Sequence, residues 1–186
     1  MTPDLETAVL RLTQWLDTER IPYMLIGGFA VLVWGEPRLT RDVDCTIWVE
    51  SERFETTVET IVKAFQSRVG KPVEFTTSTR VLPIVIAGVP TDVIFAALPY
   101  ERDAIERARP IAIGSQSVAV CAPEDLIIHK IISTRQRDRE DVESVFKKQH
   151  SQMDFAYLDA RVEELAIALA DSTFLDWYRR LRARHS

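Results

Sequence analysis

The sequence predicts an α/β protein with a mixed sheet that has helices on one side, followed by a helical C-terminal subdomain. Up to about residue 122, short apolar or β-branched runs alternate with segments of helical periodicity. From Pro123 onward, every segment has the helical pattern alone. A chain of 186 residues can bury a core without disulfides or a structural metal. We therefore expect an α/β core over residues 1–122 and a helical subdomain over residues 123–186.

The first expected elements are a helix, a strand and a second helix. Apolar residues recur at helical spacing in the opening segment: Leu5, Val9, Leu12 and Leu16. Pro22 ends this helix, and residues 23–26 form a short apolar run typical of a buried strand. A Gly-Gly pair then leads into residues 29–34, which predict a short buried helix.

The middle of the chain is rich in strand patterns. Residues 42–49 carry several β-branched side chains and predict a strand. Residues 52–68 have helical periodicity, and Gly70 stands where a C-terminal helix cap belongs. Three further strands are expected at residues 73–77, 81–87 and 92–95, the last two as a hairpin.

The core ends with a helix and two short strands before the helical subdomain begins. The helix is expected at residues 100–109, and the strands at residues 111–113 and 118–121. Pro123, followed by two acidic residues, marks a strong helix start, because proline suits the first turn and acids favour a helix N-terminus. The helix that follows either continues without interruption or breaks near Thr134.

Composition and charge exclude several classes of protein. Hydrophobic residues make up 46% and charged residues 27% of the chain, which excludes a disordered or low-complexity protein. With 23 basic and 28 acidic residues the formal net charge is −5, so nucleic acid could bind only at a local basic patch. The longest apolar run, residues 21–34, is shorter than the ~17–25 residues of a membrane-spanning helix. We expect no signal peptide, no membrane contact and a cytoplasmic location.

Three aspartates are candidate metal ligands. Asp42 and Asp44 are two residues apart on an expected strand, so their side chains share one face if Val43 points into the core. Asp92 opens a further strand. Carboxylates forced together repel one another unless a cation lies between them, and oxygen ligands suit Mg²⁺ or Mn²⁺. The alternative is that Asp42 and Asp44 are surface side chains and Asp92 a turn residue.

A Gly-Gly turn and a basic loop precede the first two aspartates. Gly27 and Gly28 lie between a strand and a helix, where backbone N–H groups and the helix N-terminus favour a bound phosphate. Arg38, Thr40 and Arg41 crowd the loop that leads to the acidic strand. Together with the three aspartates, this pattern indicates a two-metal site for phosphoryl-group chemistry.

A second group of charged residues follows Pro123. In an uninterrupted helix, residues seven and eleven apart nearly coincide in angle, which would place Lys130, Arg137 and Asp141 on one stripe. A lysine on that stripe would suit a bound triphosphate. Asp138 is a further candidate beside them. The alternative is a set of solvated pairs along the helix, such as Arg137 with Asp141.

The remaining candidates have simpler interpretations. His129 stands beside an apolar run and is expected as a partly buried histidine. Cys45 should point away from Asp44 into the core, and Cys121 is expected as a second buried thiol. Four arginines near the C-terminus form either a phosphate-contacting patch or a solvated helix end: Arg179, Arg180, Arg182 and Arg184.

The combination of these motifs resembles the nucleotidyltransferase fold of the polymerase-β superfamily. A Gly-Gly pair is followed by R-x-T-x-D-x-D at residues 38–44 and by a later aspartate on a strand, Asp92. The superfamily usually has Gly-Ser at the turn, so the Gly28 of this chain removes one hydroxyl that could contact phosphate.

Within that superfamily, the nearer likeness is to the AbiEii-type branch, known from abortive-infection toxin–antitoxin systems. That branch has a signature similar to residues 122–126, a helical lysine that corresponds to Lys130, and a later element similar to residues 135–141. The likeness spans residues 21–146. No single motif is specific, but the combination is.

The resemblance implies a metal-dependent enzyme that moves a nucleotidyl group from a nucleoside triphosphate to an acceptor hydroxyl. The catalytic and metal-binding roles would fall on Asp42, Asp44 and Asp92, with Mg²⁺ or Mn²⁺. The nucleotide would be bound by five residues: Gly27, Gly28, Arg38, Thr40 and Lys130. The secondary candidates are Arg137, Asp138 and Asp141. The acceptor would be tRNA or a protein, and the setting implies a cognate toxin or antitoxin as a partner.

A second hypothesis is that the chain has the nucleotidyltransferase fold but does not catalyse nucleotidyl transfer. The chain would then be a non-catalytic nucleotide-binding module, antitoxin-like or regulatory. The three clustered aspartates argue against this, because a protein without activity has no need of them. No stabilisation by nucleoside triphosphates with Mg²⁺ would argue against the enzyme.

Overall fold

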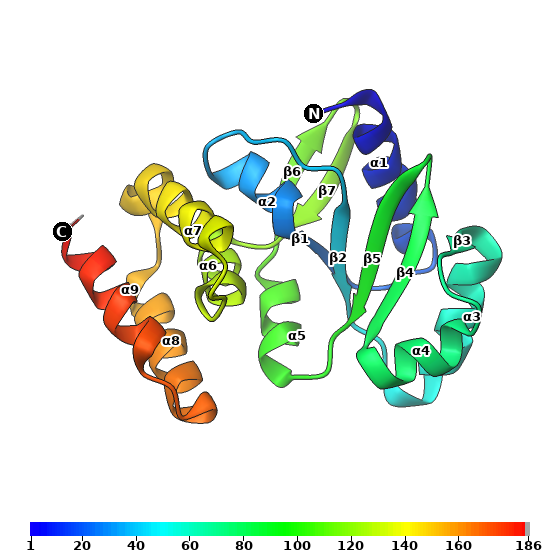
Figure 1. Ribbon diagram of the computed structural model, residues 1–186. Helices are drawn as coiled ribbons and strands as arrows, with labels where there is room; N and C mark the ends of the chain where they lie inside the picture. Colours follow the sequence, from blue (N-terminus) through cyan, green and yellow to red (C-terminus); the bar gives the residue numbers. More distant parts are fainter. Residues whose placement is uncertain (185–186) are drawn as a thin grey trace. The chain divides into compact units, whose positions relative to one another are not determined.

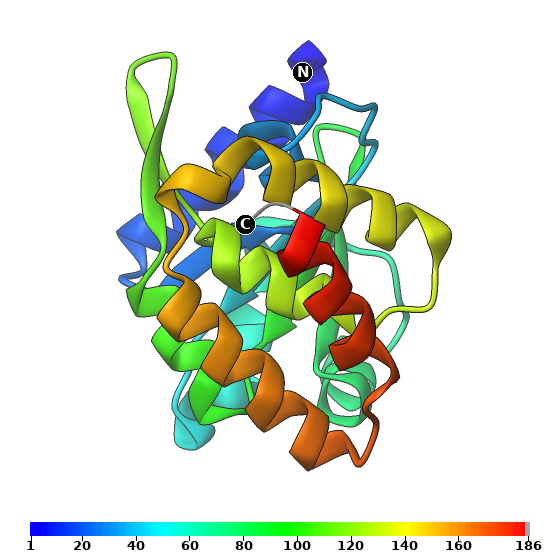
Figure 2. The ribbon, with the colours of Figure 1, turned by 90° about the vertical axis from the view of Figure 1, so that its left-hand side faces the viewer.

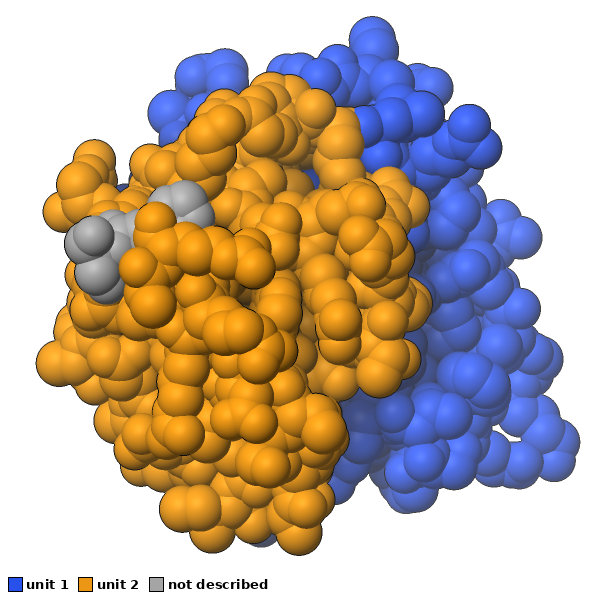
Figure 3. Space-filling model, turned by 60° about the vertical axis from the view of Figure 1, so that its left-hand side comes forward, with its two compact units in different colours: residues 1–29, 39–121 blue, residues 30–38, 122–186 orange. Residues whose placement is uncertain are grey.

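The computed structural model describes residues 1–184 and divides into two compact units (Figure 3). The first unit comprises residues 1–29 and 39–121, and the second comprises residues 30–38 and the chain from Ala122 onward. The second unit thus holds a segment, residues 30–38, that the sequence pattern assigns to the N-terminal core.

The first unit is built on a seven-stranded sheet with the strand order β3-β4-β5-β2-β1-β7-β6 (Figure 1). The pairs β2–β5 and β1–β7 are parallel and the other neighbouring pairs are antiparallel, so the sheet is mixed, as the sequence predicts. The strands are β1 (Tyr23–Ile26), β2 (Val43–Ile47), β3 (Gln66–Ser67), β4 (Val81–Ile86), β5 (Val89–Phe95), β6 (Arg109–Ile113) and β7 (Gln116–Val120).

Helix α1 (Pro3–Thr18) packs against strands β2, β4, β5 and β7 of this sheet. Thr2 caps its N-terminus by accepting a hydrogen bond from the Leu5 N–H. The expected apolar stripe is buried, with side chains at most 2% exposed: Leu5, Val9, Leu12 and Leu16. The other helices of this unit are α3 (Phe54–Ala64), α4 (Pro72–Thr79) and α5 (Pro99–Glu106), with a 3₁₀ turn at Ser51–Arg53.

Alternation along β2 and β5 separates core positions from half-exposed ones. On β2, Val43 and Cys45 are fully buried, whereas Asp44 between them is half-buried. On β5, Val93 is fully buried and Asp92 beside it is half-buried. Because successive strand residues point to opposite faces, the two aspartates share the face opposite Val43, Cys45 and Val93.

The second unit is helical. Helix α2 (Gly27–Trp34) begins in the first unit and continues into the second, where the remaining helices lie. Figure 2 shows α8 and α9, in orange and red, side by side. The helices after α2 are α6 (Pro123–Ile131), α7 (Gln136–Gln149), α8 (Phe155–Leu169) and α9 (Thr173–Arg184), with a 3₁₀ turn at His150–Gln152.

Two hydrogen bonds connect α7 to the end of α2 and the segment that follows it. Gln149 Nε2 donates a hydrogen bond to the Trp34 carbonyl at 3.0 Å, and the Glu36 N–H donates to Ser144 Oγ at 3.1 Å. Gly35 permits this close approach, since a Cβ added there would overlap Ser144 Oγ. These contacts explain why the segment groups with the C-terminal helices.

The strand predicted at residues 73–77 is wrong, because this segment forms helix α4. Pro72 occupies the first turn, and the hydroxyls of Thr77 and Thr79 donate to carbonyls one turn back. Only Thr76 of this helix is buried. The β-branched composition predicts a strand, but proline suits the first turn of a helix and the segment lacks the apolar burial of a strand in the sheet.

Two further boundaries differ from the sequence pattern or resolve its alternatives. The helix expected over residues 52–68 ends at Ala64, and Phe65 turns extended and buries its ring against Trp15. The chain then forms the short strand β3 against β4. Of the two alternatives for the helix after Pro123, the structure has the break near Thr134, since α6 ends at Ile131 and α7 begins at Gln136.

Among the described residues, none of the helices combines the length and the apolar character needed to cross a membrane.

Candidate functional site

The three aspartates expected as metal ligands come from two neighbouring parallel strands. Asp44 on β2 lies directly opposite Asp92 on β5 in the register of the sheet. Asp42 stands two residues before Asp44, just ahead of β2. Since adjacent strands run about 4.8 Å apart, the topology brings the backbones of Asp44 and Asp92 together with their side chains on one face.

Gly27 is required by the position of the Asp44 carboxylate. Gly27 has a φ of +62°, a left-handed conformation that favours glycine. A Cβ added here would overlap Asp44 Oδ2 and lie 2.8 Å from Asp44 Cγ. The carboxylate therefore lies directly against the turn at which α2 begins. This turn is the Gly27-Gly28 pair that the sequence indicates as a phosphate-binding turn, and the first backbone N–H groups of α2 follow it.

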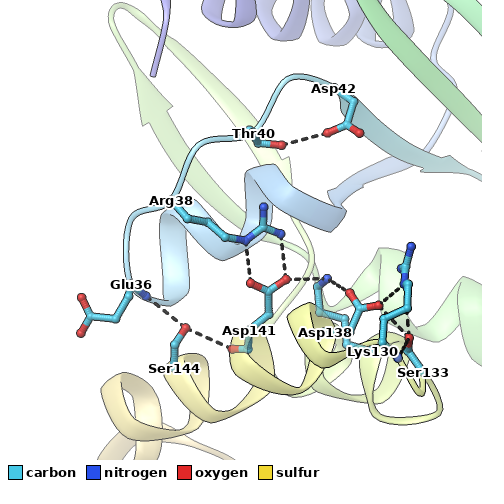
Figure 4. Close-up of polar contacts among 10 residues, drawn as sticks. Glu36, Arg38, Thr40, Asp42, Lys130, Ser133, Asp138, Asp141 and Ser144 are labelled. Atoms are coloured by element: carbon cyan, nitrogen blue, oxygen red, sulfur yellow. Dashed lines mark hydrogen bonds and ion pairs between the residues drawn. The ribbon is translucent and has the colours of Figure 1, made fainter.

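Asp42 is oriented by a buried hydroxyl. Thr40 is 5% exposed, and its Oγ1 donates a hydrogen bond to Asp42 Oδ1 at 2.9 Å (Figure 4). Asp42 itself is exposed. The threonine of the R-x-T-x-D-x-D motif therefore fixes the first aspartate of the motif.

Asp92 is paired with a cation that sequence reasoning missed. Arg68 Nη2 donates a hydrogen bond to Asp92 Oδ1. The Arg68 side chain is 36% exposed and that of Asp92 40%, so solvent reaches both partners. Arg68 lies just after β3, in a segment whose pattern reads as the end of a helix, and its sequence gives no sign of a partner on β5.

The chemistry of the three aspartates fits a divalent metal, but their carboxylates do not converge on one point. Carboxylate oxygens are the ligands that Mg²⁺ and Mn²⁺ prefer. Within residues 1–184, however, no three His, Cys, Asp or Glu side chains lie close enough together to form a metal site. The metal-binding role of Asp42, Asp44 and Asp92 therefore stays a prediction.

Within the second unit, Lys130 belongs to a network of alternating charges (Figure 4). Its Nζ lies 2.6 Å from Asp138 Oδ1 and 2.9 Å from Asp141 Oδ2. Arg38 donates two parallel hydrogen bonds to Asp141, from Nε to Oδ1 at 2.6 Å and from Nη2 to Oδ2 at 2.7 Å. Lys130 is 11% exposed, Asp138 5% and Asp141 3%. Both cations that the sequence assigns to a triphosphate are thus held by aspartates of their own unit.

The network lowers the pKa of both Asp138 and Asp141. Burial raises the pKa of Asp138, but hydrogen bonds from Lys130 and Ser133, the charge of Lys130 and a hydrogen bond from Arg135 outweigh it and lower this pKa to about 2. Burial also opposes ionisation of Asp141, yet hydrogen bonds from Arg38 and Lys130 lower its pKa below the ordinary value. Lys130 therefore keeps two anionic partners at neutral pH.

The broken helix changes how this network is assembled. The expected stripe of Lys130, Arg137 and Asp141 does not form, because the chain turns between α6 and α7. The turn instead brings Lys130 to Asp138 and Asp141, and Arg137 is exposed on α7. Ser133, whose Oγ donates to Asp138 Oδ2 at 2.7 Å, is a member that sequence reasoning missed. Ser133 lies in the turn before a helix with an acidic first turn, and this position is the sequence signal that could have indicated its role.

The arginines near the C-terminus are partly used within the second unit. Arg179 lies 3.4 Å from Glu163, and Arg182 lies 3.9 Å from Asp159 with its guanidinium over the Phe155 ring. Arg180 and Arg184 are exposed. The four arginines therefore do not form a uniform patch. Whether they contact phosphate stays open between the two alternatives.

The contact between Gly27 and Asp44 can be tested by substitution. Gly27→Ala should lower the free energy of unfolding by about 2–4 kcal/mol, because the new Cβ meets a left-handed backbone and displaces the carboxylate. Denaturant unfolding measures the change. Gly114→Ala is the matched control, since Gly114 also has a left-handed φ, +58°, and nothing lies within 4 Å of the Cβ added there. In an Asp44→Ala background the cost of Gly27→Ala should fall, and an undiminished cost would contradict the contact.

The lowered pKa of Asp138 predicts a pH-dependent contribution to stability. A folded-state pKa of about 2, against an ordinary value of 3.8, stabilises the protein above pH 4, and this stabilisation is lost as the pH falls toward 2. Asp138→Asn should therefore cost on the order of 2 kcal/mol at pH 7. Urea unfolding of the unsubstituted protein and of Asp138→Asn measures the difference between their free energies of unfolding. This difference should shrink to about half by pH 3. A difference that is independent of pH would contradict the ionised network.

Comparison with solved structures finds the same fold in proteins described as nucleotidyltransferase-like or adenylyltransferase. The solution structure of the antibiotic-resistance factor ANT(2'')-Ia has a TM-score of 0.59 and 20% sequence identity, covering 100% of this chain and 98% of that one. An antigenic nucleotidyltransferase-like protein from Paracoccidioides brasiliensis has a TM-score of 0.56 and 21% identity, covering 92% and 91% of the two chains. The lincosamide antibiotic adenylyltransferase LnuA, in its lincomycin-bound crystal structure, has a TM-score of 0.52 and 11% identity over 78% and 96%. At these identities the likeness shows a common fold.

No curated protein shows a significant match to the chain. The family match is nearly complete, since residues 5–182 fit the family described as nucleotidyltransferase of unknown function (DUF6036). By that match the chain belongs to this family of nucleotidyltransferases.

Proposed function

We propose that the protein transfers a nucleotidyl group from a nucleoside triphosphate to an acceptor hydroxyl, with a divalent metal. One observation carries the proposal: Asp44 and Asp92 lie in register on neighbouring strands, and the Asp44 carboxylate rests against the glycine turn that opens α2. Family membership supports the same reaction class. Acidic side chains beside a backbone turn of this kind suit a metal-bound triphosphate.

In this proposal the three aspartates share the acidic roles. Asp42, Asp44 and Asp92 would hold Mg²⁺ or Mn²⁺, which when bound supplies charge neutralisation and polarisation of the α-phosphoryl group. The acceptor hydroxyl would form the new bond to the α-phosphorus, and pyrophosphate would leave. Asp92 would also accept the proton of the acceptor hydroxyl. Gly27 and Gly28 would offer backbone N–H groups to phosphate oxygens.

Six other residues would act around the triphosphate. Thr40 would keep Asp42 oriented through its hydrogen bond. Lys130 and Arg38 would neutralise negative charge on the nucleotide, with Asp138 and Asp141 as positioning residues that fix both cations. Arg137 is an exposed secondary candidate.

The identity of the acceptor is the most specific part of the proposal. The resemblance to the AbiEii-type branch suggests tRNA or a protein, in a toxin–antitoxin or defence setting with a cognate toxin or antitoxin as partner. The exposed Arg180 and Arg184 would suit an RNA backbone. The relatives of similar fold differ in this respect, since one was solved with adenylyl-2''-tobramycin and another with lincomycin bound.

The second candidate is a non-catalytic nucleotide-binding module, and one observation favours it. The Asp92 carboxylate is engaged by Arg68. Such a module would bind a nucleoside triphosphate without transferring any part of it.

Nucleotide-dependent stabilisation tests the site. A nucleoside triphosphate with Mg²⁺ at 100 times its dissociation constant should raise the free energy of unfolding by about 2.7 kcal/mol. Thermal unfolding with ATP, CTP, GTP and UTP measures the shift. Asp44→Asn should abolish the Mg²⁺-dependent part and leave the metal-free protein as stable as before or more so, because it relieves like-charge repulsion.

Glu74→Gln is the control for loss of one carboxylate, since Glu74 pairs with the exposed Lys71 just before its own helix. This variant should keep the full nucleotide shift. No shift with any of the four nucleotides would contradict the proposed site. A large loss of metal-free stability in Asp44→Asn would instead make Asp44 a structural hydrogen-bond acceptor.

A further inference from the structure

Arg68 and the two in-register aspartates lie in one row across the sheet. The Arg68 N–H donates to the Pro83 carbonyl at 2.9 Å, which extends the β3–β4 pairing by one residue. Pro83 lies opposite Asp92 in the β4–β5 register, and Asp92 lies opposite Asp44 in the β5–β2 register. The backbone therefore fixes where the Arg68 side chain starts, two strands from Asp92.

The side chain of Arg68 uses this position to reach the carboxylate of Asp92. Its Nη2 donates to Asp92 Oδ1, across the intervening strand β4. With 36% and 40% of the two side chains exposed, the pair is solvated and its net stabilisation is small. A solvated pair of this kind can be exchanged for another cation without unfolding the strand.

We propose that Arg68 is the resident counterion of Asp92 and competes with the divalent metal for this carboxylate. This inference rests on the proposed function, since it concerns the metal that the function requires. Without metal, Arg68 offsets the repulsion between Asp92 and its neighbour Asp44. When a metal approaches, the guanidinium must release Asp92, and its positive charge opposes the incoming cation.

The competition has a functional consequence. Metal alone meets an occupied carboxylate and binds weakly. Metal carried by a nucleoside triphosphate brings the negative charge that compensates both cations, so it binds more readily. Arg68 thus makes occupancy of the metal site depend on the nucleotide.

Mn²⁺ binding to the full chain without nucleotide tests the competition. Free Mn²⁺ is followed by its electron paramagnetic resonance signal during titration of the protein. Arg68→Gln should bind Mn²⁺ about tenfold more tightly than the unsubstituted protein, because one opposing charge beside the site is gone. Arg68→Lys, which keeps the charge, should retain the weak affinity.

Lys71→Gln is the matched control, because it removes one positive charge three residues away that pairs with Glu74 rather than with Asp92. Its Mn²⁺ affinity should stay within about twofold of the unsubstituted protein. Asp92→Asn should erase the gain of Arg68→Gln when the two are combined. Circular dichroism of each variant verifies the fold.

Unchanged or weaker Mn²⁺ binding in Arg68→Gln would overturn the inference. The ion pair would then only stabilise the position of β3. If the unsubstituted protein binds Mn²⁺ with a nucleoside triphosphate in that case, the proposed function stands without this inference. If neither protein binds Mn²⁺, with or without nucleotide, both the inference and the proposed function fail.

Discussion

The first unit is organised by the need to hold like charges close together. The parallel pairing of β2 and β5 sets Asp44 and Asp92 side by side, and burial of the alternate residues on each strand commits both carboxylates to one face. Their repulsion is offset locally, since Arg68 pairs with Asp92. Gly27 has no side chain and so leaves room for the Asp44 carboxylate. The turn that favours a phosphate and the acids that favour a metal are therefore parts of one packing arrangement.

In the second unit, buried carboxylates are stabilised by direct pairing with cations. Asp138 and Asp141 are almost completely buried, and each is compensated by cations at hydrogen-bonding distance. Removing one partner of such a group is costly, because the other charge is left without compensation. The network fixes Lys130 between two carboxylates and ties Arg38 to α7. Preorganised cations of this kind suit an anionic ligand, because little ordering remains to be done on binding.

Sequence reasoning reached the sheet and the acidic strand because their signals are local. The alternation around Asp44 and the glycine turn can be read from a few neighbouring residues. The helix at residues 72–79 could not be predicted in the same way, since its β-branched composition favours a strand and its exposure depends on tertiary context. Arg68 was missed because its link to Asp92 depends on the register of three strands. Ionic partners that meet only through such pairing have no signature in the sequence.

The most direct test of the account follows the transferred group itself. The protein is incubated with Mg²⁺ and cellular RNA, protein and small-molecule fractions, using nucleoside triphosphates labelled on either the α- or the γ-phosphate. The account predicts label in one fraction from the α-phosphate alone, and none with Asp44→Asn. Label from the γ-phosphate would mean phosphoryl rather than nucleotidyl transfer. Nucleotide binding without label in any fraction would contradict the enzyme and leave the non-catalytic module.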